Sequence, residues 1–254
     1  MMPSRYALPV WWRNFSMYRR TWKITILPNF FEPLLYLVSI GIGVGAYVSS
    51  MGGVSYAAFL APGLVAVAAM NGASFEVTYN AFVRLNFEKT YASMLTTPIE
   101  PEDVLAGEVL WAVTRATLYG GCFLVVIAAW GLAPLPSSLF AFLLLPLTGL
   151  LFAALGIVFA LRVPAIEMFS FYFTLFLTPL FLFSDVFFPL QERLGGIWLY
   201  VAEILPLLHP VRLMRAAFAG AWSPILLWDL AYIAILSAGL LWLAARVTRR
   251  RLTS

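Results

Sequence analysis

Two long uncharged stretches constrain the fold of this chain more than any other feature. Residues 33–75 and 116–161 contain no Asp, Glu, Lys or Arg, and they are 43 and 46 residues long. An α-helix that crosses about 30 Å of hydrocarbon needs about 20 residues, so each stretch has room for two membrane-spanning helices. Turn-forming residues divide both stretches near the middle, at residues 49–53 and 131–138.

Composition points to the same class of protein. Apolar residues make up 62% of the 254 residues and charged residues only 11%, whereas a soluble domain usually carries about 25% charged residues. A globular protein of this size cannot bury so much apolar surface in one core, so lipid must act as the solvent for much of it. Further apolar runs at about 166–188 and 225–245 bring the predicted spans to six. We therefore predict an all-α membrane protein with one transmembrane domain over residues 1–254.

Basic residues are distributed unequally between the two sides of this arrangement. With the N-terminus in the cytoplasm, 12 of the 16 Lys and Arg residues fall on cytoplasmic segments. The positive-inside rule therefore predicts a multi-pass protein with both termini cytoplasmic. The sequence pI of about 9.3 is explained by cations that flank apolar runs, and no solvated basic domain exists that would hold a nucleic acid.

The N-terminal segment, residues 1–23, is predicted to be a cytoplasmic interfacial helix. At 100° per residue, four aromatic side chains share one helix face and four cations the other. The aromatic residues are Trp11, Phe15, Tyr18 and Trp22, and the cations are Arg13, Arg19, Arg20 and Lys23. This pattern is typical of a helix that lies in the membrane interface. The helix either only anchors the first span or is an elbow that also contacts a cytoplasmic partner.

The longest polar interruption, residues 82–108, is predicted to be cytoplasmic. Glu102 and Asp103 stand where a helix would begin, because acidic side chains complement the dipole of a helix N-terminus. Before them, residues 87–95 can form a short helix that docks a motor domain, and a plain solvated loop is the alternative. The predicted docking residues are Phe87, Glu88, Lys89, Tyr91 and Leu95.

Residues 189–224 form the outer segment between spans five and six. Their two apolar stretches, 196–205 and 210–219, are each about ten residues long and too short to cross a bilayer. Irregular backbone at membrane depth is tolerated only where protein or a water-filled cavity satisfies it. We therefore predict a re-entrant helical hairpin that caps the outer end of a pathway, with an interfacial extracellular loop as the alternative. The predicted outer-gate residues are Asp185, Phe187, Phe188, Pro189, Pro206 and Pro210.

The domain thus divides into four parts along the chain: the interfacial helix in 1–23, spans one to five in 24–188, the outer segment in 189–224, and span six with a basic cytoplasmic tail in 225–254. Charged groups near apolar spans usually face the bundle interior or water. Glu76, Glu108 and Arg115 are such groups, and they either form interhelical pairs or line a path.

Several kinds of chemistry are missing from the sequence. There is no G-x-x-x-x-G-K-[ST] nucleotide loop, so ATP hydrolysis is not expected on this chain. Cys122 is the single cysteine and His209 the single histidine, which excludes Cys- and His-based metal clusters. His209 precedes Pro210 and is expected to end a loop. We predict no catalytic residue, no metal site and no cofactor on this chain.

The sequence resembles the ABC-2-type permease family, particularly the branch of nodulation-factor (lipochitooligosaccharide) export permeases. Three segments carry the resemblance: NFEKTYASMLTTPIEPEDVLAGEVLW at 86–111, LTGLLFAALGIVFAL at 147–161, and FYFTLFLTPLFLFSDVFFPLQERLGGIWLYVAEILPLLHPVRLMR at 171–215. The resemblance implies a dimer of permeases, a coupling helix at 87–95, an outer gate at 190–218, and two cytoplasmic ABC ATPase subunits that bind ATP and Mg. Many relatives have Ser-Gly where this chain has Ser184-Asp185.

The function implied is export of an amphipathic molecule across a bacterial inner membrane, such as a lipooligosaccharide, glycolipid or hydrophobic drug. The expected partners are the ATPases, a second permease copy in a homodimer, membrane lipid and the cargo. A partner-free channel or ion-coupled carrier is the alternative, and it predicts transport that is insensitive to ATP depletion. A membrane-embedded enzyme is a third class, but its nearest acidic cluster, at residues 100–103, is better explained as a turn and a helix start.

Overall fold

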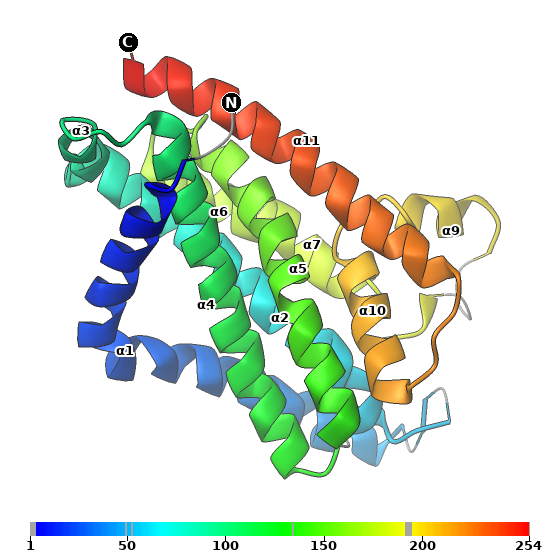
Figure 1. Cartoon of the computed structure of the whole chain (residues 1–254). Coiled ribbons are helices and arrows are strands. Elements are labelled where there is room, and N and C mark those ends of the chain that lie inside the picture. Colours follow the sequence, from blue (N-terminus) through cyan, green and yellow to red (C-terminus); the bar gives the residue numbers. More distant parts are fainter. Residues whose placement is uncertain (1–3, 49, 52, 134, 191–194, 254) are drawn as a thin grey trace.

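The computed structural model describes residues 4–48, 50–51, 53–133, 135–190 and 195–253. Helices make up most of these residues (Figure 1). Apart from one isolated bridge between Met51 and Val54, no strand occurs in the part of the chain that is described. The predicted all-α class is confirmed.

In the described part of the chain, five helices are long and apolar enough to cross a membrane. They are Tyr56–Phe87, Pro101–Ala129, Ser138–Ala160, Ile166–Phe183 and Ile225–Arg250. They overlap the predicted spans two to six, but the first two extend beyond the uncharged stretches into residues 82–108. The first predicted span falls on the second half of α1 (Ala7–Tyr36) and on the π-helical segment Leu37–Gly43. The six-span count stays a prediction.

The five spans are built from the elements labelled in Figure 1, some of them interrupted by π-helical turns. The second span is α2 (Tyr56–Phe75), continued by Glu76–Asn80 and Val83–Phe87; the others are α4 (Pro101–Ala129), α5 (Leu135–Ala160), α6 (Phe169–Phe171) with Tyr172–Leu177 and α7 (Thr178–Phe183), and α11 (Ile225–Thr253). Residues 49, 52 and 134 of the predicted turns lie outside the described residues. The side chain of Glu32, the charged residue just before the first uncharged stretch, is also outside the described part.

Small residues allow α2, α4 and α5 to pack closely at the centre of the bundle. A Cβ on Gly72 of α2 would lie 2.6 Å from the ring of Tyr119 on α4, and one on Gly149 of α5 would lie 2.7 Å from Cβ of Ala116. In membranes, helices associate through such close backbone approach, because lipid provides no hydrophobic drive between them.

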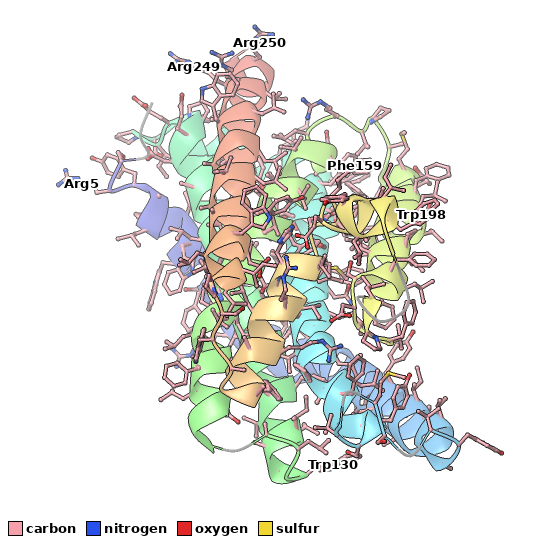
Figure 2. All side chains as sticks on the ribbon, turned by 90° about the vertical axis from the view of Figure 1, so that its right-hand side faces the viewer. Arg5, Trp130, Phe159, Trp198, Arg249 and Arg250 are labelled. Atoms are coloured by element: carbon pink, nitrogen blue, oxygen red, sulfur yellow. The ribbon has the colours of Figure 1, made fainter. Side chains whose placement is uncertain are left out.

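Both ends of the chain lie at one end of the bundle, which we call the terminal end. Figure 2 shows Arg5, Arg249 and Arg250 there, and Trp130 at the opposite end. The start of α4 ties the chain ends together: Ser4 N donates to Oδ1 of Asp103 at 2.6 Å, and Arg249 lies 3.7 Å from Glu102. Glu100 and Asp103 also form a capping box, so α4 begins where the acidic residues predicted a helix start.

The aromatic face of the N-terminal segment packs against α4. Figure 1 shows α1 changing direction, so that its first half leans on α4 and its second half crosses the lower part of the bundle. Trp11 stacks on Phe15 and donates to Oγ1 of Thr114 at 3.0 Å, and Tyr18 packs edge-on against Trp111. Of the predicted stripe, Trp22 is the member that stays exposed.

The described part of the outer segment includes α9 (Ile197–Ala202) and α10 (Leu208–Ala219). Residues 191–194 lie outside the described part. α10 contacts α2, α5 and α11, and one of its faces is fully buried. His209 does not end a loop as expected; it lies in the first turn of α10 and is buried. Whether the pair re-enters a bilayer stays a prediction.

Candidate functional sites

The predicted docking helix exists but is shorter than expected. It is α3 (Thr90–Met94), and it follows a corner at Lys89, whose φ is +53°. Phe87 is 67% exposed, although a large apolar side chain usually avoids water. Glu88 and Lys89 are also exposed, and Leu95 is half-buried. The corner lies at the terminal end of the bundle (Figure 1).

Tyr91 differs from the expectation that it faces outward. Only 6% of it is exposed, and it lines a small cavity together with Glu108 and Thr248. Burial raises the pKa of the Tyr91 phenol well above its ordinary value. The chain changes direction at the αL corner of Lys89, and α3 therefore points the Tyr91 side chain into the bundle. The sequence pattern did not reveal this corner. Of the five predicted docking residues, Phe87, Glu88 and Lys89 are therefore the exposed ones.

A buried cluster of charges lies below this corner, and we call it the Arg84 cluster: Glu76, Arg84, Glu108 and Arg115. Nη2 of Arg84 is 2.7 Å from Oε1 of Glu76 and 2.5 Å from Oε2 of Glu108. Both carboxylates are only 2% exposed. Asn80 donates to Glu76 at 2.8 Å and Asn14 to Glu108 at 3.0 Å. The cluster thus joins α1, the end of the second span and α4.

Arg115 completes the cluster with a looser contact. Its Nε lies 3.6 Å from Oε2 of Glu76, and its guanidinium lies 4.6 Å from the ring centroids of Tyr18 and Tyr119. The cluster borders a cavity of about 310 Å³ between α1 and the second span. Glu76, Glu108 and Arg115 are therefore brought together, and whether they also line a path stays a prediction.

A second buried cluster holds α10 against α11, and we call it the Arg212 cluster: Glu203, His209, Arg212 and Asp229. Arg212 contacts Glu203 at 2.7 Å and Asp229 at 2.6 Å. Nδ1 of His209 is 2.7 Å from Oδ1 of Asp229, and its ring stacks on Tyr232. The hydrogen bond from Arg212 lowers the pKa of Glu203. Glu203, His209 and Asp229 are ligand types for a metal, but Arg212 already supplies the positive charge between the two carboxylates.

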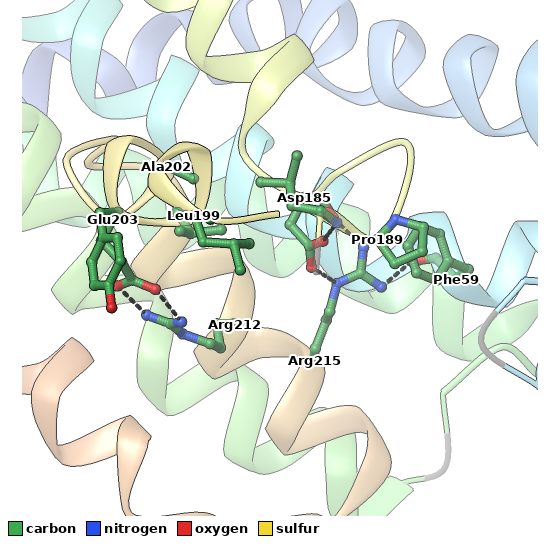
Figure 3. Close-up of a pocket in the computed structure, with 12 residues that line it drawn as sticks. Phe59, Asp185, Pro189, Leu199, Ala202, Glu203, Arg212 and Arg215 are labelled. Atoms are coloured by element: carbon green, nitrogen blue, oxygen red, sulfur yellow. Dashed lines mark hydrogen bonds and ion pairs between the residues drawn. The ribbon is translucent and has the colours of Figure 1, made fainter. Parts of the chain in front are cut away.

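Two of the six predicted outer-gate residues, Asp185 and Pro189, line a cavity of about 810 Å³ (Figure 3). Asp185 has a φ of +62°, and its carboxylate accepts from Leu190 N at 2.8 Å and lies 2.9 Å from Nε of Arg215. Arg215 also donates to the carbonyls of Phe59 and Asp185. Leu199 and Tyr200 of α9 supply apolar wall. The cavity is therefore amphipathic, with paired charges along one side.

Phe187, Phe188, Pro206 and Pro210 do not line this cavity. Phe187 packs edge-on against Phe181, and its carbonyl accepts from Tyr56 at 3.2 Å. Phe188 packs with Leu190, Ala202 and Leu208. Pro189 lines the cavity, while Pro206 precedes α10 and Pro210 lies in its first turn.

Sequence reasoning missed three arginines that organise these sites. None of the three, Arg84, Arg212 and Arg215, was predicted as a site residue. A signal for the last two was available: residues 209, 212 and 215 share a helix face. Asp229 at the start of an apolar span also requires a partner.

Comparison with known proteins agrees with this architecture. A profile described as ABC-2 type transporter matches residues 8–219. Nodulation protein J of Rhizobium leguminosarum bv. trifolii is 40% identical over 84% of this chain and 81% of that protein. Nodulation protein J of Neorhizobium galegae is 34% identical over 96% and 93%. Inner membrane transport permease YadH of Escherichia coli K12 is 26% identical over 83% and 82%. The chain belongs to the ABC-2 type transporter family, as its sequence resemblance implied.

Proposed function

We propose that this chain is the transmembrane permease subunit of an ATP-binding-cassette exporter in a bacterial inner membrane. Two separate ATPase subunits bind ATP and Mg and supply the energy of ATP hydrolysis, and a second copy of the permease completes the transmembrane pair. The chain itself is a transport subunit and not an enzyme. Family membership and the missing nucleotide loop support this division of labour.

The observation that carries the proposal is the exposed corner before α3. Phe87 is 67% exposed. In the sequence it follows Arg84 of the buried cluster by three residues and directly precedes the charged pair Glu88 and Lys89. An exposed aromatic residue beside charges is typical of a contact that a partner desolvates. Because Arg84 is three residues from Phe87, a force applied at the corner reaches the second span and α4 directly.

An amphipathic cargo is favoured over a small ion. The 810 Å³ cavity combines the apolar side chains of Leu190, Leu199 and Leu208 with the guanidinium groups of Arg212 and Arg215. Such a lining suits a molecule with an apolar part and a polar part. The resemblance to nodulation-factor export permeases favours a lipooligosaccharide within this class, ahead of a glycolipid or a hydrophobic drug.

The test targets the corner and spares the fold. Phe87→Asp introduces a charge at an exposed position, so the chain should insert and fold but lose its ATPase partner during co-purification. Tyr47→Asp is the matched control, because Tyr47 is a 92% exposed aromatic residue before α2, at the other end of the second span. Tyr91→Asp is unsuitable, since burying a carboxylate there would disturb folding.

Two outcomes would contradict the proposal. One is a Phe87→Asp complex that retains its ATPase and hydrolyses ATP as the unmodified complex does. The other is cargo transport by the purified chain in proteoliposomes with no ATPase present, which would favour a channel or an ion-coupled carrier.

A further inference from the structure

The terminal end of the bundle carries an apolar groove with a basic rim that the transport proposal does not use. The groove has a volume of about 590 Å³ and lies between the start of α1, α4 and α11. Its wall includes Leu8, Val109, Leu110, Leu241 and Trp242, and its polar end includes Ser4, Arg5, Glu102 and Arg246. The geometry points to a binding site for one anionic phospholipid, with its phosphate at Arg5 and Arg246 and an acyl chain along the groove.

The wall of the groove is apolar and open. Leu8 is 62% exposed, Leu110 44% and Trp242 58%. A contiguous apolar surface of this kind marks a site that another apolar molecule covers. Because α4 and α11 are spans, the molecule that supplies acyl chains at this surface is a lipid.

The two basic residues at the rim are available to a ligand. Among the residues that the structure describes, neither Arg5 nor Arg246 forms an ion pair. The one acidic residue that lines the groove, Glu102, lies 3.7 Å from Arg249 instead. The guanidinium of Arg246 lies over the Trp242 ring at 3.6 Å, which fixes its plane and leaves its edge for an oxyanion. Arginine pairs well with phosphate because its planar fork offers several donors.

The position of Arg5 is also set by the fold. Ser4 donates from its backbone N and its hydroxyl to the carboxylate of Asp103, at 2.6 and 3.1 Å. These bonds fasten the chain before α1 to the first turn of α4. Because Arg5 directly follows this anchored residue, its position at the groove is fixed. A basic pocket between helices at the surface of a bilayer is a typical site for an anionic head group.

A second copy of this chain is a poorer occupant. Two copies in one membrane have the same orientation, so a two-fold contact through this groove would bring both basic rims to the same level. Four guanidinium groups would then lie close together, and the acidic lining residue of each copy, Glu102, already faces Arg249. A lipid phosphate instead supplies the missing negative charge.

The test measures lipid binding by the purified full chain. Native mass spectrometry after delipidation would follow rebinding of dioleoyl phosphatidylglycerol and dioleoyl phosphatidylcholine. We expect a preference for phosphatidylglycerol that falls roughly thirty-fold in Arg5→Gln/Arg246→Gln, the factor for two basic contacts at a membrane surface. Arg19→Gln/Arg20→Gln removes the same charge from exposed positions of α1 outside the groove and should retain the preference.

A second variant separates the groove from its rim. Ala106→Phe fills the wall of the groove and leaves both arginines in place, so it should also weaken phosphatidylglycerol binding; circular dichroism would verify its fold. Three results would overturn the inference: equal loss in the two double variants, unchanged lipid binding in Ala106→Phe, or displacement of the lipid by millimolar glycerol phosphate alone. A change of oligomeric state in Ala106→Phe with lipid binding unchanged would assign the groove to a second copy instead.

Discussion

Replacing Arg84 with glutamine removes the centre of the buried cluster near α3. Two carboxylates, each 2% exposed, then lose the guanidinium that contacts them at 2.7 and 2.5 Å. Glu76 retains Asn80 and the 3.6 Å contact to Arg115, whereas Glu108 retains the amide of Asn14 and lies beside the phenol of Tyr91. Removing one partner of a buried ion pair costs about 3–5 kcal/mol, because the remaining charge is left uncompensated.

That cost should appear as a fall in thermal stability. A change of about 1 kcal/mol shifts Tm by about 2–4 °C for a domain of this size, so Arg84→Gln should lower Tm by roughly 6–20 °C. The measurement is thermal unfolding of the purified chain in detergent, followed by tryptophan fluorescence. Arg162→Gln is the control, because Arg162 is exposed and its hydrogen bond goes to the carbonyl of Val158; its effect should stay within about 0.5 kcal/mol.

A double-mutant cycle then tests the cause. Glu108→Gln neutralises one of the two carboxylates, so adding it to Arg84→Gln should recover part of the loss. The coupling free energy between the two positions should be about 1–3 kcal/mol. The reasoning fails if Arg84→Gln melts within about 2 °C of the unmodified chain, or if the effects of the two substitutions simply add.

Three further predictions concern packing, pH and backbone strain. Gly107→Ala should destabilise the chain by about 1–3 kcal/mol, because the added Cβ would lie 2.5 Å from Cβ of Val10 and 2.8 Å from the carbonyl oxygen of Ala7. Gly239→Ala is the control, because a Cβ added there has no neighbouring atom within 4 Å. It should be neutral or stabilising in the same unfolding assay. The hydrogen bond from Arg212 lowers the pKa of Glu203, so the pair stabilises the fold above the unfolded carboxyl pKa of about 4.3, and this contribution is lost as pH falls through the lower folded pKa. When Tm is measured against pH, it should therefore fall less steeply in acid for Glu203→Gln than for the unmodified chain. An identical slope would contradict the pairing. Asp185→Gly should be more stable than Asp185→Ala by about 1 kcal/mol, because a φ of +62° suits glycine, and equal Tm values would show that this conformation is not retained.

The backbone at Asp185 determines which side chains fit there. A φ of +62° is a left-handed conformation that glycine adopts readily. Aspartate tolerates the same conformation better than most side chains, and here it also pairs with Arg215 at 2.9 Å. The acidic residue thus serves a local ion pair, a role that the sequence comparison alone did not suggest.

The docking element shows where sequence reasoning failed and why. The sequence predicted a short helix within residues 87–95, and α3 lies there, but the pattern did not single out Phe87 as the exposed aromatic residue. Tyr91 was placed on the wrong side because helical periodicity gives the spacing of side chains but not the direction in which a short helix turns. That direction is set by the αL corner at Lys89, and a lysine in αL is not predictable from local preference.

The sequence by itself determined the class of protein, the positions of the five span-length helices, and the start of α4. These features depend on hydropathy, chain length and capping, and all of these act over neighbouring residues. Only the tertiary structure decided which charges meet: Arg84 with Glu76 and Glu108, and Arg212 with Asp229. Partners that lie on different helices are chosen by packing, because a buried charge is stable only beside the particular group that three-dimensional contact brings to it.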